Sequence, residues 1–427
     1  MSRIDEQDFD EKRLARRQRR KRSQLIAYIC LAVFVLVIFG AGAFGVISVK
    51  KVFDSHKVEK QAEEEQKAAE EASAQSVVIE TPEAEQEPQE MTQEDLLDEV
   101  VNSCISEMPI EDKVAALFIV TPEQLTGVDT AIKAGSGTQD ALSTYAVGGI
   151  VYSKKNIKSA EQISEMLSTT ASMSKYPLFT ITNENGNGAI ASAIGIEGVS
   201  DINSSDAGLC AGSAIGSAMF GYGFNFDLAP NMDITESGEY GTDLAAVQDI
   251  TSSLVNGIQE SGVSACAVAF PASADTSKQM AVIDKSKEEL VTGEYTVFKN
   301  AIDNSNIKAI QMSNASFPQV SGDNTPASLS KMIIGDELRG ALGFDGVVVT
   351  GAMNEGAITE YYTPEQSAVE AIKAGADMIY CPEDFTAAYE GLLSAVNSGE
   401  ISEDRINESL IRIYRIKYAD RVGEIVG

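Results

Sequence analysis

Eight short apolar segments between residues 117 and 382 constrain the fold of this chain more than any other feature. Longer amphipathic stretches separate them, such as SAEQISEMLSTTASM (159–173) and TPEQSAVEAIKAGA (363–376). Buried strands that alternate with helices indicate a parallel sheet covered on both faces. The pattern predicts an α/β fold, a (β/α)8 TIM-type barrel, over residues 96–427. The eight segments are LFIVT (117–121), GGIVYS (148–153), LFTIT (178–182), FNFDLAP (224–230), SACAVAFP (264–271), IKAIQMS (307–313), GVVVT (346–350) and ADMIYCP (376–382).

An open doubly wound sheet is the alternative that the same alternation allows. The barrel is favoured because no GxGxxG motif follows any of the eight segments. In a barrel, functional groups lie at the C-terminal ends of the strands. The residues at these ends are Glu184, Asn185, Asp233, Asp275, Asn314, Gly351 and Glu383.

The N-terminal part of the chain predicts a membrane anchor. Residues 25–49 contain no charged residue, and such a segment spans about 37 Å as a helix, more than the about 30 Å of a bilayer core. The basic cluster KRLARRQRRKR (12–22) precedes it and favours a cytoplasmic tail over residues 1–24. We therefore expect one transmembrane helix, with the C-terminal domain outside the cytoplasm. A cleaved signal peptide is the alternative, because Ala41-Gly42-Ala43 resembles a cleavage site.

Residues 50–95 predict an acidic stalk or linker, part disordered and part helical. They include KVEKQAEEEQKAAEEASAQ (57–75) and ETPEAEQEPQE (80–90), with few large apolar groups. Such a composition buries too little surface to offset chain entropy. The stalk therefore separates the predicted anchor from the predicted barrel.

Charge and histidine content exclude several classes of function. The chain has 33 Lys and Arg against 64 Asp and Glu, a net charge of −31, which opposes binding to nucleic acid. Its single histidine, His56, lies in the stalk. The barrel can therefore hold neither an Asp–His pair, nor a Ser–His–Asp triad, nor a histidine metal site. The five cysteines have no metal-binding spacing, and we expect buried free thiols and no metal or cofactor.

Five sequence blocks resemble the N-terminal barrel of glycoside hydrolase family 3, especially its bacterial β-N-acetylhexosaminidases. The resemblance covers roughly residues 96–422. It implies a barrel that hydrolyses β-glycosidic bonds with retention, without a metal or cofactor. It also implies an aspartate nucleophile after the seventh strand and an Asp–His pair after the fifth. The blocks are EDKVAALFIV (111–120), GGIVYSKKNIKSAEQI (148–163), GFNFDLAPNMDI (223–234), TPASLSKMIIGDELRGALGFDGVVVTGAMNEGAI (325–358) and AVEAIKAGADMIYCP (368–382).

The residues that carry the family's chemistry are replaced in this chain. The nucleophile position of the family's VVTDAL motif falls on Gly351. In the loop after the fifth strand, Val268 and Ala269 stand where the family has Lys and His, and Ser273 replaces a second His. Retaining hydrolysis needs one attacking group and one proton donor about 5 Å apart. The replacements therefore predict a degenerate, catalytically inactive member of the family.

Two further motifs also depart from the family pattern. After the third strand, Thr182 and Asn187 replace an acidic residue and an arginine, while Glu184 and Gly186 persist. The family's Asp-Ser-His dyad falls near Gln279 and Ala281, which can supply no proton. These losses gather at one end of the predicted barrel.

Five polar residues remain as candidates at that end. Glu355 and Asp275 are possible substitutes for the missing catalytic groups, but Glu355 also suits an exposed loop and Asp275 a turn. Glu184 and Asp233 are candidate ligand-binding residues, although each also suits a structural hydrogen bond or cap. Asn314 is the third candidate ligand-binding residue.

Three functions stay open from the sequence. The favoured one is an inactive barrel that binds a peptidoglycan-type or other β-linked glycan, or a membrane protein partner. The second is an active glycosidase that uses Glu355 with Glu184 or Asp275. The third is a scaffold that binds no sugar.

Overall fold

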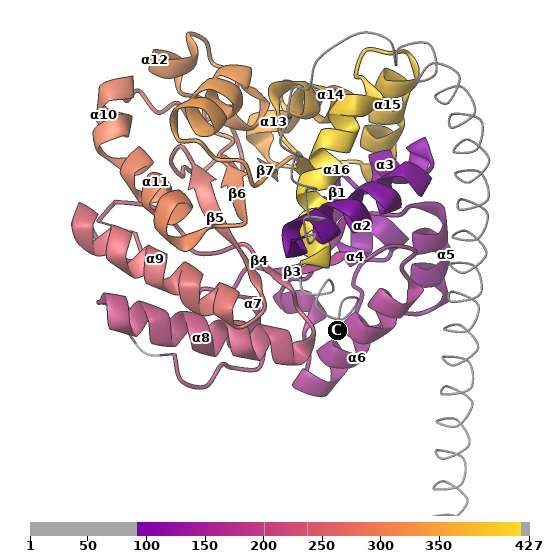
Figure 1. The fold of residues 1–427 in the computed structure, drawn as a ribbon, viewed down its shortest axis with the longest axis horizontal. Helices are drawn as coiled ribbons and strands as arrows, with labels where there is room; N and C mark the ends of the chain where they lie inside the picture. Colours follow the sequence, from indigo (N-terminus) through magenta and orange to yellow (C-terminus); the bar gives the residue numbers. More distant parts are fainter. Residues whose placement is uncertain (1–91, 200, 237, 420–427) are drawn as a thin grey trace, which may run out of the picture. The chain divides into compact units, whose positions relative to one another are not determined.

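A computed structural model describes residues 92–199, 201–236 and 238–419, and these residues form a closed parallel barrel (Figure 1). The eight strands pair in chain order and the last closes on the first. Each predicted apolar segment holds one strand, so the (β/α)8 prediction is confirmed and the open sheet is excluded. The strands are β1 (Phe118–Val120), β2 (Gly149–Val151), β3 (Phe179–Thr182), β4 (Phe226–Asp227), β5 (Ser264–Phe270), β6 (Ala309–Met312), β7 (Val347–Ala352) and β8 (Met378–Tyr380).

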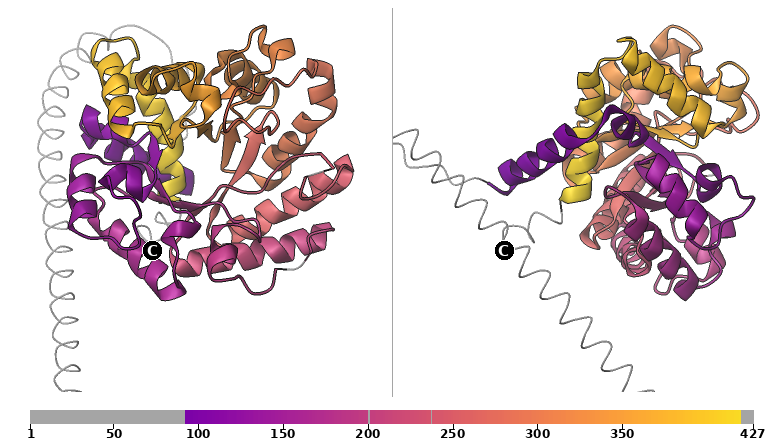
Figure 2. Two further views of the ribbon diagram at one scale, coloured as in Figure 1. Left: turned by 180° about the vertical axis from the view of Figure 1, so that it is seen from behind. Right: turned by 90° about the vertical axis from the view of Figure 1, so that its right-hand side faces the viewer.

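Helices surround the strands on the outside of the barrel (Figures 1 and 2). The longer ones are α2 (Gln93–Glu107), α5 (Ser136–Thr144), α6 (Ala160–Met173), α8 (Ser205–Tyr222), α9 (Leu244–Glu260), α11 (Glu294–Ser305), α14 (Pro364–Ala374), α15 (Phe385–Asn397) and α16 (Glu403–Tyr418). The shorter ones are α3 (Ile110–Ala115), α4 (Pro122–Thr126), α7 (Ala189–Ala193), α10 (Lys287–Thr292), α12 (Pro318–Ser321) and α13 (Gly356–Thr359), with the 3-10 turns η1 (Lys154–Asn156) and η2 (Ala327–Leu329) and the π-helix η3 (Met332–Ala341).

Helix α14 illustrates how the local sequence sets an element's bounds. The Thr363 hydroxyl accepts from the backbone N–H of Gln366, whose side chain in turn caps Thr363, and Pro364 fits the first helical position. Gly375 ends the helix in the left-handed conformation, at φ 113°. The capping residues Thr363 and Gly375 therefore set the two ends of this helix.

Irregular pairing marks the C-terminal ends of two strands. The register of β5 against β6 shifts between Ala267 and Phe270. The register of β7 against β8 shifts between Val349 and Ala352. The two loops to which the family resemblance assigns catalysis follow these irregular ends, so the strand ends set the course of both loops.

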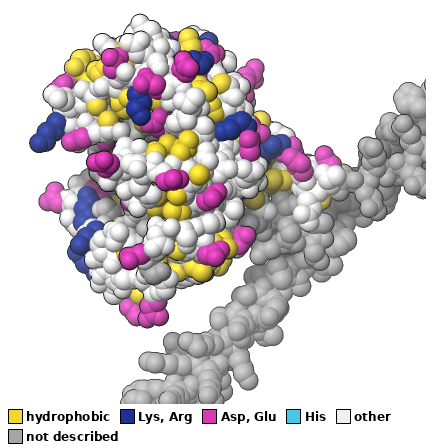
Figure 3. Space-filling view, turned by 90° about the vertical axis from the view of Figure 1, so that its left-hand side faces the viewer, with side chains coloured by type: hydrophobic (Ala, Val, Ile, Leu, Met, Phe, Trp, Pro, Cys, Tyr) yellow, Lys and Arg dark blue, Asp and Glu magenta, His cyan; other side chains and the backbone are white. Residues whose placement is uncertain are grey.

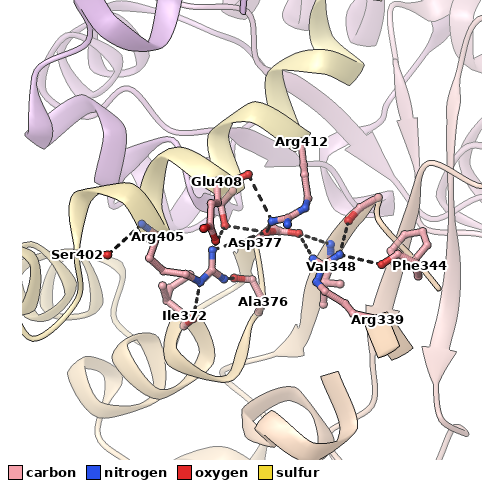
Figure 4. A network of polar contacts seen from close by, with 12 residues as sticks. Arg339, Phe344, Val348, Ile372, Ala376, Asp377, Ser402, Arg405, Glu408 and Arg412 are labelled. Carbon is pink, nitrogen blue, oxygen red and sulfur yellow. Dashed lines mark hydrogen bonds and ion pairs between the residues drawn. The ribbon is translucent and has the colours of Figure 1, made fainter. Parts of the chain in front are cut away.

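Asp377 forms the centre of a polar network at the opposite, N-terminal end of the strands (Figure 4). Its carboxylate is fully buried and accepts from the Arg339 guanidinium at 2.7 Å and from the Val348 N–H at 2.9 Å. The other oxygen accepts from the Ser409 hydroxyl at 2.7 Å and from Arg412 at 3.1 Å. The network therefore joins η3, β7, β8 and α16.

The same network explains why the segment before β7 keeps its family pattern. Arg339 also donates to the carbonyls of Phe344 and Gly346, each at 3.1 Å. A Cβ on Gly346 would lie 2.6 Å from the Phe344 ring and 2.7 Å from the Lys308 carbonyl oxygen, so this position has no room for a side chain. The LGFDGVVV sequence is thus retained because it builds the start of β7, independently of any catalytic group.

Several expectations concern residues outside the described part. No helix within residues 92–419, omitting 200 and 237, is long and apolar enough to cross a bilayer. The predicted tail (1–24), transmembrane helix (25–49) and nearly all of the stalk (50–91) lie outside the described residues. Helix α2 begins at Gln93, so the predicted boundary at residue 95 falls within its first turn. The described cysteines Cys104, Cys210, Cys266 and Cys381 are free thiols, two of them buried.

Candidate functional site at the C-terminal ends of the strands

Gly351 lies near the C-terminal end of β7, and a neighbouring side chain occupies the space beside it. Its N–H donates to the Ser328 hydroxyl at 2.8 Å. A Cβ at this position would lie 2.6 Å from both Cγ and Oδ1 of Asn314. An aspartate at residue 351 would therefore require Asn314 to move.

Asn314, at the end of β6, is itself held in place by hydrogen bonds. Its Nδ2 donates to the Ala352 carbonyl at 2.8 Å and to Oε2 of Glu355 at 2.9 Å. The same Glu355 oxygen accepts from the Thr276 hydroxyl at 2.5 Å. Asn314 is 2% exposed and its amide is engaged within the protein, so its role as a ligand contact stays a prediction. Glu355 ties two loops together and is not free to attack a substrate in this conformation.

The loop after β5 lies against the loop after β7. The N–H groups of Gly356 and Ala357 donate to the carbonyls of Ser277 and Thr276, at 3.0 and 3.1 Å. A Cβ on Gly356 would lie 2.1 Å from the Lys278 carbonyl oxygen, so the two backbones approach too closely for any residue but glycine. The NEGAI sequence therefore serves this contact.

Asp275 and Asp233 both support the loop after β5. Asp275 accepts from the N–H and the hydroxyl of Ser277, at 3.1 and 2.6 Å, and these bonds lower the pKa of its exposed carboxyl. Oδ1 of Asp233 accepts from the Ser273 N–H at 3.2 Å. The structure thus places Asp275 in the turn that its sequence suggested, and it gives Asp233 the role of a loop anchor.

Glu184, after β3, is a structural carboxylate. One oxygen accepts from the N–H groups of Gly186 and Gly188, both at 2.9 Å. The other accepts from Ile190 and Ala191, at 2.8 and 2.9 Å. The side chain is fully buried, and four donors occupy it. Glu184 therefore shapes the loop and the start of α7 in this structure, and its role in binding a sugar stays a prediction.

Asp227, at the end of β4, is a second buried acid that the sequence analysis did not single out. Its Oδ1 accepts from the Glu184 N–H at 2.8 Å, and its Oδ2 finds no hydrogen-bond partner among the described residues. Burial, together with the nearby Glu184 charge, raises the pKa of Asp227 well above its usual range. The available signal was a lone acid inside the apolar run FNFDLA.

The described part of the chain contains no metal-binding cluster, and two of its thiols are buried. No group of three or more His, Cys, Asp or Glu residues within it could hold a metal ion. Burial raises the pKa of Cys381 to about 12 and that of Cys266 well above its usual value. These thiols therefore stay protonated and unreactive.

Comparison with known proteins connects this geometry to a family. The model of the "Glycosyl hydrolase family 3 N terminal domain" matches residues 109–416, well over half of the chain. This chain belongs to glycosyl hydrolase family 3. The resemblance inferred from the five sequence blocks is thereby confirmed.

The family 3 relatives include bacterial hexosaminidases. A β-hexosaminidase of Hydrogenovibrio crunogenus is 25% identical over 286 residues, covering 61% of this chain and 79% of that protein. The β-hexosaminidase A of Pseudoalteromonas piscicida is 21% identical, and the match covers 65% of this chain and 54% of that one.

Solved family 3 structures share the fold. A β-N-acetylglucosaminidase from Paenibacillus aligns with a TM-score of 0.67 and 27% identity, over 74% of this chain and 63% of that one. A β-N-acetylhexosaminidase from Beutenbergia cavernae aligns with a TM-score of 0.63 and 22% identity, over 73% and 99% of the two chains. The chain is thus a hexosaminidase-like family 3 barrel that covers less than two thirds of the Paenibacillus enzyme.

Proposed function

We propose that this chain is a membrane-anchored, extracytoplasmic family 3 barrel that binds a β-linked glycan without cleaving it. The observation that carries the proposal is the filled space at Gly351. Asn314 occupies the volume where a side chain at this position would begin, and Glu355 and Thr276 hold it there. The site therefore lacks an attacking carboxylate at the end of β7 and has no space prepared for one.

The lack of a suitable proton donor among the described residues supports the same proposal. A retaining glycosidase needs an acid/base group as well as a nucleophile. The only imidazole of the chain, His56, lies in the predicted stalk, and Asp275 has a lowered pKa that suits an ionised turn residue rather than a proton donor. The relatives named as hexosaminidases favour a GlcNAc-containing β-linked glycan as the ligand. The apolar segment 25–49 supports the proposed anchor.

An activity assay on the full-length chain, purified in detergent, tests the proposal. We expect no turnover of an aryl N-acetyl-β-glucosaminide and saturable binding of a chitin oligosaccharide in calorimetry. Turnover that Glu355→Gln abolishes would instead establish an active enzyme with rearranged carboxylates. A complete absence of oligosaccharide binding would favour the scaffold function.

Restoring the nucleophile provides a sharper test. Gly351→Asp should give no activity, and it should lower the unfolding free energy by about 1–3 kcal/mol because of the clash with Asn314. Gly351→Asp combined with Asn314→Ser should recover part of this stability and still show no turnover, because the proton donor is missing. Urea unfolding and the aryl glycoside assay measure the two quantities. Activity in either variant would contradict the proposal.

A further inference from the structure

Two segments that follow β1 and β2 carry an unusual share of the barrel's lysines. Residues 127–135 lie between α4 and α5, and residues 153–159 lie between β2 and α6. Together they hold four lysines and one acid, Asp129, in a chain with 33 basic and 64 acidic residues. Their exposed apolar and basic side chains form the surface discussed below, called the basic surface. It consists of Val128, Ile132, Lys133, Lys154, Lys155 and Lys158.

Side-chain amides hold the two segments against each other. The Asn156 amide donates to the Ala131 carbonyl at 2.9 Å. The Gln162 amide donates to the Ile132 carbonyl at 2.6 Å, and its oxygen accepts from the Lys158 N–H at 2.8 Å. The backbones that carry the lysines of both segments are therefore fixed side by side before any partner arrives.

Most of these lysines have no acidic partner. Lys155 forms an ion pair with Glu123 at 3.3 Å. Lys133, Lys154 and Lys158 are exposed and form no ion pair with another described residue. Acidic side chains are scattered over the barrel face in Figure 3, and such a face repels an anionic partner. The basic surface is therefore the place where an anionic partner meets attraction instead.

Two exposed aliphatic side chains add apolar area to the same surface. Val128 is 47% exposed and Ile132 is 43% exposed, and both lie in the segment that carries Lys133. Exposed apolar side chains with a polar rim mark sites of contact with membranes or proteins. Lysine stems lie along apolar surface while their ammonium groups reach outward. This combination fits the headgroup region of a bilayer, where binding grows with buried apolar area and with attraction to anionic lipids.

We propose that the basic surface rests on a bilayer that contains anionic lipid. Val128 and Ile132 enter the headgroup region, and Lys133, Lys154 and Lys158 pair with lipid phosphates. The inference rests on the membrane anchor of the proposed function and adds which face of the barrel meets the membrane.

The predicted anchor makes a small contact area sufficient. A helix over residues 25–49 holds the barrel near the bilayer, at an effective concentration on the order of millimolar. Each lysine at an anionic surface strengthens binding by about fivefold. Three unpaired lysines therefore favour the bound orientation strongly in an anionic bilayer and hardly at all in a neutral one.

Lysine acylation of the full-length chain in lipid nanodiscs tests the inference. One disc contains phosphatidylcholine alone, and the other contains about one third phosphatidylglycerol, an anionic lipid. A water-soluble succinimidyl ester labels exposed amines, and mass spectrometry measures the rate at each lysine. Lys133, Lys154 and Lys158 should react at least about fivefold more slowly in the anionic disc. Lys331, an exposed lysine that precedes η3, is the matched control and should react equally in both.

Variants of the basic surface make the test sharper. Lys154→Gln combined with Lys158→Gln should bring the two rates at Lys133 to within about twofold of each other. Asp129→Asn and Glu161→Gln each remove an exposed acid that lies close to the lysines in the sequence, and each should increase the protection. The unfolding midpoint of each variant checks that it is folded.

The outcomes separate this inference from the proposal on which it rests. Equal rates at the three lysines in both discs would overturn the inference alone. Loss of the chain from phosphatidylcholine vesicles in an alkaline wash would overturn the proposed anchor, and the inference with it. Equal protection by soluble polyphosphate around a neutral disc would assign the basic surface to an anionic polymer and overturn the lipid contact.

Discussion

The two ends of the barrel differ in how their acidic groups are used. At the N-terminal end, Asp377 is fully buried and pairs with Arg339 and Arg412, so that one carboxylate joins four elements. At the C-terminal end, Asp275 and Glu355 accept bonds from the neutral hydroxyls of Ser277 and Thr276, and no Lys or Arg of the described residues forms an ion pair with either carboxylate.

The difference separates the requirements of the fold from those of catalysis. Parallel strands need a packed and hydrogen-bonded N-terminal end in any barrel, whereas the C-terminal loops vary with function. A glycine at residue 351, where the family motif has an aspartate, is therefore compatible with an intact β7. The contacts around Asn314 then stabilise the site in a form that excludes an aspartate.

The largest effect should come from breaking the N-terminal network. Asp377→Ala leaves Arg339, Arg405 and Arg412 without their buried partner and should lower the unfolding free energy by about 3–5 kcal/mol. Asp345→Ala, an exposed acid in the turn before β7, should change it by less than about 0.5 kcal/mol. Urea unfolding measures both. Equal losses in the two variants would remove the basis of the comparison.

Removing the buried carboxylate of Glu184, at the C-terminal end, should give the next largest effect. Glu184→Gln keeps the side-chain shape but turns one acceptor into a donor that faces backbone N–H groups, and it should cost about 2–4 kcal/mol. Asp275→Asn, in an exposed turn, should cost much less. The same denaturation experiment compares them. A small loss for Glu184→Gln would show that the four backbone bonds contribute little to stability.

Asp227 should give the smallest effect and a characteristic pH dependence. Burial raises its native pKa above that of the unfolded chain, so its contribution to stability is complete at low pH and is lost as the pH rises through the native pKa. Asp227→Asn cannot lose a proton. Its stability should match the parent near pH 4 and exceed it by about 1–3 kcal/mol at pH 8.

Urea midpoints at several pH values measure this difference. Asp275→Asn is the matched control with the opposite sign. The native pKa of Asp275 is lowered, so its contribution is present above the unfolded pKa and is lost as the pH falls. A constant difference between Asp227→Asn and the parent at all pH values would show that the pKa of Asp227 is the same in the native and unfolded states.

The sequence by itself determined the barrel, its eight strands and the family, and it predicts that the family's catalytic residues are replaced. Each of these is a local or additive property: apolar runs with caps, a motif such as LGFDGVVV, or a count of histidines. It could not determine which polar groups are accessible. Glu184 and Asn314 have the same sequence signature as ligand-binding residues, and both are buried.

Only the tertiary structure decided whether a side chain can be accommodated at residue 351. Asn314 follows β6 and Gly351 lies in β7, so their contact depends on how these two strands pair. Side chains that share a space must satisfy one another's hydrogen bonds and volumes, and the chain order does not encode which of them meet.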